Sequence, residues 1–162
     1  GPREFVTTCL LASLSDETPE GKSIVELGRE SGVRMRSLQT AGARMIQFTA
    51  ETKCSGVDLA DGTQIRKGAF DAIRKITEAA GNKFPKEIEE VISEISGNGG
   101  TPLVVCVDRK VTGVIELQDI IKPGIQERFE RLRKMGVKTV MVTGDNPLTV
   151  HCRKGGGGRL YS

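Results

Sequence analysis

The fold is decided by the stretch Val57-Asp58-Leu59-Ala60-Asp61-Gly62-Thr63-Gln64-Ile65-Arg66-Lys67-Gly68. Val57, Leu59 and Ile65 alternate with polar residues, which is the pattern of strands with one buried face. Asp61-Gly62 lies between them, and this dipeptide favours a two-residue hairpin turn. The stretch therefore predicts an antiparallel hairpin. The strands expected here and just before it are residues 44–49, 53–59 and 63–66.

Helical patterns surround these strands, because apolar residues recur three or four positions apart on both sides. Two later apolar runs, 103–107 and 111–117, are expected to pair as a hairpin across Asp108-Arg109-Lys110. An antiparallel sheet interleaved with helices, of the α+β class, is the predicted architecture. The expected helices are residues 19–30, 69–80, 85–96 and 123–135.

The pattern changes after Ile120. There the expected helix is followed by an apolar strand, residues 137–142, that ends in Thr143-Gly144-Asp145-Asn146. A buried strand with a polar loop at its carboxyl end is typical of an open parallel α/β sheet. We therefore expect a fragment of a second unit to begin near residue 121. Four divisions are expected: an artificial scar or linker (1–7), a main domain (8–120), a partial second unit (121–150) and a flexible or artificial tail (151–162).

Composition narrows the classes of function. The 162 residues carry a net charge of +3 and 4% aromatic residues, which is weak support for nucleic-acid binding. No apolar run is long enough for a membrane span, and no secretory signal is expected at the start. The four cysteines form no CxxC pair, so buried reduced thiols are expected and no metal site is predicted.

Several residues invite a binding interpretation beside a structural one. Lys67-Gly68 lies where a strand ends and a helix begins, a place that suits phosphate, but spacing alone favours a solvated lysine and a turn glycine. Phe48 is either a core side chain or a platform that stacks on a purine. Glu17 is either a carboxylate at a helix start or an acceptor for an adenine amino group. Gly21-Lys22-Ser23 is not a phosphate loop, since the required glycine five positions earlier is missing.

Taken in order, the motifs resemble one family, the ATP-binding subunits of bacterial Kdp potassium-transporting P-type ATPases. The resemblance covers about residues 8–150, and the ordered set is specific although each piece alone is weak. The motifs are Asp16-Glu17-Thr18-Pro19-Glu20-Gly21-Lys22-Ser23-Ile24, Phe48-Thr49-Ala50, Ser55-Gly56, Ile65-Arg66-Lys67-Gly68, Thr101-Pro102-Leu103-Val104-Val105, Gly113-Val114-Ile115, Gln126-Glu127-Arg128-Phe129, Leu132-Arg133-Lys134-Met135-Gly136 and Thr143-Gly144-Asp145-Asn146.

The resemblance implies a nucleotide-binding domain that is a twisted antiparallel sheet flanked by helices, inserted in an α/β phosphorylation domain of haloacid-dehalogenase-like fold. It implies ATP as the ligand, with Phe48 stacked on adenine and Glu17 and Ser55 near the base. The remaining residues that it places at the nucleotide are Lys67, Gly68, Asp71 and Asp145.

The same resemblance implies limits. The family's DKTGT and GDGxND motifs are absent from these residues, so the chain is expected to bind ATP without hydrolysing it and to leave Mg²⁺ to the rest of the pump. The implied partners are the phosphorylation and actuator domains and the potassium-channel-like subunit, on the cytoplasmic side of the cell membrane. The alternatives are a fragment of another P-type ATPase or of a haloacid-dehalogenase-like phosphatase, and a non-enzymatic interaction module.

Overall fold

Eight strands form one sheet in which every strand lies beside its neighbours in the sequence. The computed structural model describes residues 2–30, 32, 41–119, 124–143, 149–151 and 159–161. The strands are β1 (Arg44–Ile46), β2 (Cys54–Asp58), β3 (Gln64–Gly68), β4 (Thr101–Val107), β5 (Lys110–Gln118), β6 (Lys138–Thr143), β7 (Thr149–His151) and β8 (Arg159–Tyr161). The helices are α1 (Pro2–Ser13), α2 (Pro19–Glu30), α3 (Phe70–Ala79), α4 (Lys86–Gly97) and α5 (Ile125–Lys134). All strand pairs are antiparallel except β5 with β6.

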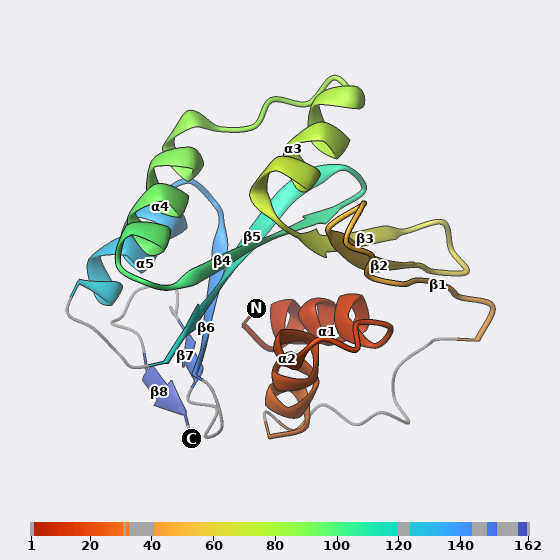
Figure 1. The fold of residues 1–162 in the computed structure, drawn as a ribbon, viewed down its shortest axis with the longest axis horizontal. Helices are drawn as coiled ribbons and strands as arrows, with labels where there is room; N and C mark the ends of the chain where they lie inside the picture. Colours follow the sequence, from red (N-terminus) through yellow and green to blue (C-terminus); the bar gives the residue numbers. More distant parts are fainter. Residues whose placement is uncertain are drawn as a thin grey trace.

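Helices cover both faces of this sheet. Figure 1 shows α1 and α2 on one side and α3 and α4 on the other. The core under α3, α4 and α5 includes Ile73, Ile88, Val104 and Leu132. The core under α1 and α2 includes Phe5, Ile24, Val105 and Ile115. A sheet buried by helices on both faces confirms the expected architecture of a sheet flanked by helices, although the parallel β5–β6 pair makes that sheet mixed.

The β2–β3 hairpin has a longer turn than the sequence predicted. Leu59 donates its backbone N–H to the carbonyl of Thr63 (2.8 Å), so three residues form the turn and not two. Gly62 closes it by donating to the carbonyl of Leu59 (3.0 Å), and its φ of +94° is a left-handed conformation that glycine adopts without strain. The Asp61 side chain accepts from the N–H of Thr63 (2.8 Å) and fixes the turn.

Strand β1 is shorter than expected, because pairing stops where Ile46 lies opposite Gly56. The predicted range 44–49 was wrong at its carboxyl end. Thr49 begins a turn there: its carbonyl accepts from the N–H of Lys53 (2.8 Å), and its hydroxyl accepts from the N–H of Thr52 (3.0 Å). The turn leaves Phe48 beyond the sheet, on the way from β1 to β2.

Most of the predicted scar or linker, residues 1–7, is helical. Residues 2–7 belong to α1, in which Phe5 and Val6 are 3% and 1% exposed. The sequence analysis did not predict this helix, because the first residues were interpreted as artificial sequence. Their apolar stripe continues through Cys9 and Leu10. At the other end β8, which lies in the stretch expected to be a tail, pairs in antiparallel fashion with β7, of which only His151 belongs to that stretch. Residues 152–158 lie outside the described part of the chain.

The second unit joins the first through one continuous sheet, since β6 pairs with β5 from Gly113 opposite Lys138 to Gln118 opposite Thr143. A buried ion pair, Arg128 of α5 with Glu116 of β5, fastens α5 to this junction. Gln118 donates to the same Glu116 oxygen (2.6 Å). The expected break near residue 121 is therefore bridged by strand pairing and by a buried charge pair.

Replacing Gly56 with alanine is expected to destabilise the fold by about 2 kcal/mol. A Cβ at this position would lie 2.0 Å from the carbonyl oxygen of Ile65 and 2.8 Å from Cδ of Arg66, and the backbone oxygen has no room to move. Gly97→Ala is the matched control, because no atom lies within 4 Å of its added methyl and the residue belongs to a helix. Urea unfolding measures both; Gly97→Ala should leave the stability unchanged or raise it by up to about 1 kcal/mol.

Candidate functional site

Most of the predicted site residues lie at one end of β1, β2 and β3, beside the loop between α1 and α2. Lys67 of β3 is directly opposite Ser55 of β2, and Gly68 follows it. The α1–α2 loop reaches this end of the sheet, because the Ser15 hydroxyl donates to the carbonyl of Ile46 (2.7 Å), the last residue of β1. Phe48 follows Ile46 by two residues. The α1–α2 loop and the sheet of β1, β2 and β3, which are distant in the sequence, thus lie side by side (Figure 1).

The Lys67 side chain is sealed beneath the α1–α2 loop. It is 1% exposed, although lysine is one of the residue types least often buried. Its ammonium donates to Asp16 Oδ2 (2.8 Å) and to the hydroxyl of Ser13 (2.9 Å). The Ser13 hydroxyl in turn donates to the carbonyl of Cys9 (2.8 Å). Lys67 is therefore not the solvated lysine that the structural interpretation of the sequence allowed.

Asp16 is the partner that the sequence analysis missed, since it was named only as the first residue of a motif and given no role in the site. Its Oδ1 accepts from the N–H of Thr18 (3.0 Å) while Oδ2 accepts from Lys67. Gly21 leaves space for Asp16, because a Cβ at residue 21 would lie 2.4 Å from the Asp16 carbonyl oxygen and 2.5 Å from the Asp16 Cγ. The Asp-x-x-x-x-Gly spacing therefore has a packing reason, because residue 21 lies against the carboxylate that holds Lys67.

Burial alone would raise the pKa of the Asp16 carboxyl, but hydrogen bonds from Lys67 and Thr18 outweigh it and hold the pKa below its ordinary value of 3.8. The folded protein thus binds this proton more weakly than the unfolded chain does. The stabilisation by ionised Asp16 is complete above pH 3.8 and is lost as the pH falls through the lower, folded-state pKa.

Asp16→Asn is accordingly expected to cost about 3 kcal/mol of stability at neutral pH, since it leaves a buried lysine without its counter-charge. The difference from the parent should shrink below pH 3.8, where the parent's own carboxylate becomes protonated. Urea midpoints between neutral pH and pH 2 test this. Asp71→Asn, at a carboxylate that is 64% exposed, serves as control; a difference that stays constant down to the lowest pH would contradict the assignment.

Ser55 is equally buried. It is 0% exposed, and its hydroxyl donates to the carbonyl of Ala12 (2.7 Å), the last residue but one of α1. Ser55 and Lys67 thus form a polar floor that α1 and the following loop cover. Glu17 and Phe48 are exposed, Phe48 to 37%. The region therefore combines a buried polar floor with an exposed aromatic ring and carboxylate.

Gly68 and Asp71 lie where β3 passes into α3. A Cβ at Gly68 would lie 2.3 Å from the carbonyl oxygen of Lys53 and 2.6 Å from Cβ of Cys54, so the glycine is needed for close packing of two backbones. Lys53, which the sequence analysis did not single out, has φ +54° and lies 3.8 Å from the Asp71 carboxylate. Both of these side chains are more than half exposed and can therefore move. Asp145 lies outside the described residues.

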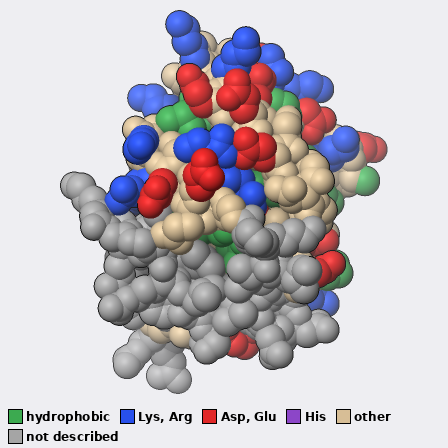
Figure 2. Space-filling view, turned by 90° about the vertical axis from the view of Figure 1, so that its left-hand side faces the viewer, with side chains coloured by type: hydrophobic (Ala, Val, Ile, Leu, Met, Phe, Trp, Pro, Cys, Tyr) green, Lys and Arg blue, Asp and Glu red, His purple; other side chains and the backbone are tan. Residues whose placement is uncertain are grey.

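Other site chemistries find little support in the described residues. No group of three His, Cys, Asp or Glu side chains among them could hold a metal ion. Burial raises the pKa of Cys9 to about 12 and that of Cys106 to about 11, so neither thiol is poised as a nucleophile. No helix in the described part of the chain is long and apolar enough to cross a membrane. Figure 2 shows positive and negative side chains intermixed on one face, and not a basic patch. Opposite charges also pair in the described residues, as Arg131 and Glu94 do.

Comparison with known proteins gives one consistent answer. The family of haloacid dehalogenase-like hydrolases matches residues 4–155. The chain is 48% identical over 147 residues to a potassium-transporting ATPase ATP-binding subunit of Clostridium acetobutylicum, covering 91% of this chain and 22% of that protein. It is 57% identical over 143 residues to ATP-binding subunit 2 of the potassium-transporting ATPase of Listeria innocua, covering 86% and 21%.

Solved structures agree at the level of the fold. A zinc-transporting PIB-type ATPase in the E2.Pi state matches with a TM-score of 0.53 and 21% identity, over 90% of this chain and 21% of that one. The E2P state of such an ATPase gives a TM-score of 0.54 at 19% identity. The chain thus spans about a fifth of the length of the relatives that it matches.

Proposed function

This chain belongs to the family of haloacid dehalogenase-like hydrolases, and we propose that it is the ATP-binding part of a potassium-transporting P-type ATPase. The observation that carries the proposal is its high identity, over most of its length, to subunits that are named for ATP binding. The geometry supports it: an exposed aromatic ring and a carboxylate lie at the end of the sheet where a buried lysine and serine form a polar floor.

In the proposed complex Phe48 stacks on the adenine ring, because its exposed face is free to bury apolar area against a base. Glu17 and Ser55 are proposed to lie near the base edge. Lys67 forms the charged floor beneath it, held by Asp16 and Ser13. A direct contact between the Lys67 ammonium and a phosphate would require the α1–α2 loop to release it first.

The phosphate end is proposed to lie toward the start of α3. The first turn of a helix offers free N–H groups and a partial positive charge, which favour phosphate. Gly68 and Asp71 flank this helix start, and Asp145 is proposed to approach the nucleotide from the loop after β6. Asp71, in the first turn of α3, is proposed to lie close behind Gly68 at the nucleotide.

We propose that the chain delivers ATP and does not cleave it. The DKTGT and GDGxND motifs of the resembled pumps are missing from these residues, and no described group could hold a metal ion. Magnesium and the acceptor aspartate are therefore proposed to come from the remainder of the pump. That remainder would include the phosphorylation and actuator domains and the potassium-channel-like subunit, with this part on the cytoplasmic side of the membrane.

Equilibrium binding with a parallel hydrolysis assay tests the proposal. ATP should bind with millimolar to high micromolar affinity, about −4 to −6 kcal/mol, because much of the phosphate contact belongs to the absent domain. ATP should bind more tightly than GTP, and no inorganic phosphate should be released. Equal affinity for the two nucleotides would contradict adenine recognition, and turnover would contradict the role in delivery.

A further inference from the structure

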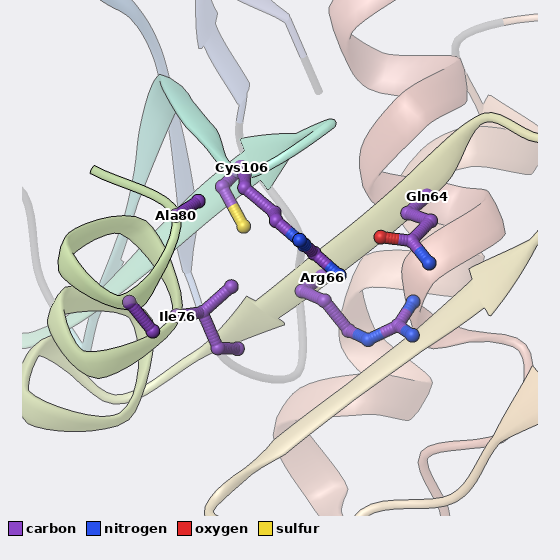
Figure 3. Close-up of a pocket in the computed structure, with 7 residues that line it drawn as sticks. Gln64, Arg66, Ile76, Ala80 and Cys106 are labelled. Atoms are coloured by element: carbon purple, nitrogen blue, oxygen red, sulfur yellow. The ribbon is translucent and has the colours of Figure 1, made fainter. Parts of the chain in front are cut away.

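A pocket lies on the opposite face of the sheet from the Lys67 floor. Neighbouring residues of a strand point to opposite faces, so Lys67 faces α1 while Gln64 and Arg66 face α3. The pocket has a volume of about 360 Å³ and is lined by Gln64, Arg66, Cys106 and Arg109, with an apolar wall from the end of α3. Figure 3 shows Gln64 and Arg66 on one strand, Cys106 on the next, and Ile76 and Ala80 on the helix. We call it the arginine pocket.

Arg66 is a fixed part of this pocket. Its stem crosses β2 at Gly56, where a Cβ would lie 2.8 Å from Arg66 Cδ. Its guanidinium donates to the carbonyl of Ile65 (2.9 Å) and lies 2.8 Å from the Asp58 carboxylate, with the side chain 17% exposed. These contacts hold the group at the pocket edge and balance its charge.

Arg109 brings a second guanidinium whose charge is not balanced. It occupies the β4–β5 turn with φ +65°, beside Asp108 at +50°, and such left-handed positions favour Asn or Gly over arginine. The turn is held by the N–H of Gln64 donating to Asp108 Oδ1 (3.0 Å) and by Asn82 donating to the Arg109 carbonyl (2.9 Å). Within the described residues no carboxylate forms an ion pair with Arg109.

We propose that the arginine pocket binds the phosphate group of a small phosphomonoester. Two guanidiniums and the Gln64 amide offer donors from three side chains, which suits an anion with three terminal oxygens better than a carboxylate with two. No acidic side chain lines the pocket. Its volume exceeds that of phosphate alone, and Ile76 and Ala80 would contact the carbon part of the ester. An arginine kept at a strained turn position is a reason to look for function there.

The test is an NMR titration of the isotope-labelled chain with inorganic phosphate, glycerol 3-phosphate and acetate, with sodium chloride added to hold the ionic strength constant. Saturable shifts are expected at the amides of Gln64, Arg66, Cys106 and Arg109 with both phosphates, and weaker ones with acetate. The amides of Glu17 and Phe48 should not move. Non-saturating shifts spread over the surface, or equal responses to acetate and phosphate, would overturn the proposal.

Two variants sharpen the test. Arg109→Asn removes the charge and puts a residue that suits the left-handed turn in its place, so the fold should be at least as stable as the parent while phosphate affinity falls by at least about tenfold. Lys110→Gln removes one positive charge from the next residue, which does not line the pocket, and should change the affinity by less than about twofold, as for a screened surface charge. Equal losses in the two variants would overturn the proposal, because they would indicate a general charge effect.

Discussion

Phe48→Ala is expected to lower the affinity for ATP by about 5- to 150-fold, because stacking of a base on an aromatic ring contributes about 1–3 kcal/mol. The ring is 37% exposed and lies beyond the end of β1, outside the four buried clusters. Its removal should therefore leave the free energy of unfolding within about 0.5 kcal/mol of the parent's. Calorimetric titration with ATP and urea unfolding measure the two quantities.

Met45→Ala is the matched control for this change. Among the described residues Met45 is the other large apolar side chain that is exposed, at 39%, and it belongs to the strand that precedes Phe48. It has no proposed contact with the nucleotide, so ATP affinity should not change. If Phe48→Ala bound ATP as well as the parent, or if both variants lost affinity equally, the stacking assignment would be wrong.

Lys67→Met is expected to destabilise the fold by about 3–5 kcal/mol, the usual cost of removing one partner from a buried ion pair. The variant keeps most of the side-chain volume but leaves the Asp16 carboxylate, 4% exposed, without its counter-charge. The loop that carries Glu17 is expected to become more mobile, because the ion pair that joins Asp16 to β3 is lost. Urea unfolding gives the cost, and hydrogen exchange at residues 13–18 reports the loosening.

Two further variants distinguish the loss of the buried ion pair from the loss of a lysine in general. Lys53→Met removes a lysine whose partner Asp71 lies 3.8 Å away on the surface, and it should have almost no effect on stability. The double variant Asp16→Leu with Lys67→Met should recover much of the lost stability, since an apolar pair can replace a buried ion pair. A double variant as unstable as the sum of two damaging single changes would show that the pair is not the cause.

The features that sequence predicted well are those decided by neighbours in the chain. The alternation around Val57 and Ile65 predicted two strands with one buried face each, and both residues are buried against α1. The helical spacing of Ile73 and Ile76 predicted the face of α3 that meets the core. Such periodicity depends only on residues that are close in the sequence, so it can be recognised without the rest of the fold.

The features that sequence did not predict depend on contacts between distant residues. Asp16 and Lys67 are 51 positions apart, and each alone reads as a surface residue. The tie of Ser55 to Ala12 spans 43 positions. Nothing local distinguishes a buried charged pair from two solvated side chains, so the floor of the candidate site became visible only with the strands and α1 in place. Phe48, Gly68 and the other site residues came from the ordered motifs, since their spacing alone fitted structural interpretations equally well.

The central claim is that the end of β1, β2 and β3 beside the α1–α2 loop recognises adenine. An NMR titration of the labelled chain with ATP, then GTP and adenosine, tests it most directly. Shifts gathered on Phe48, Ser55 and residues 67–71, larger for ATP than for GTP and shared at Phe48 with adenosine, are the predicted result. A sample with well-dispersed amides that shows no shifts at millimolar ATP, or shifts confined to other strands, would contradict the claim.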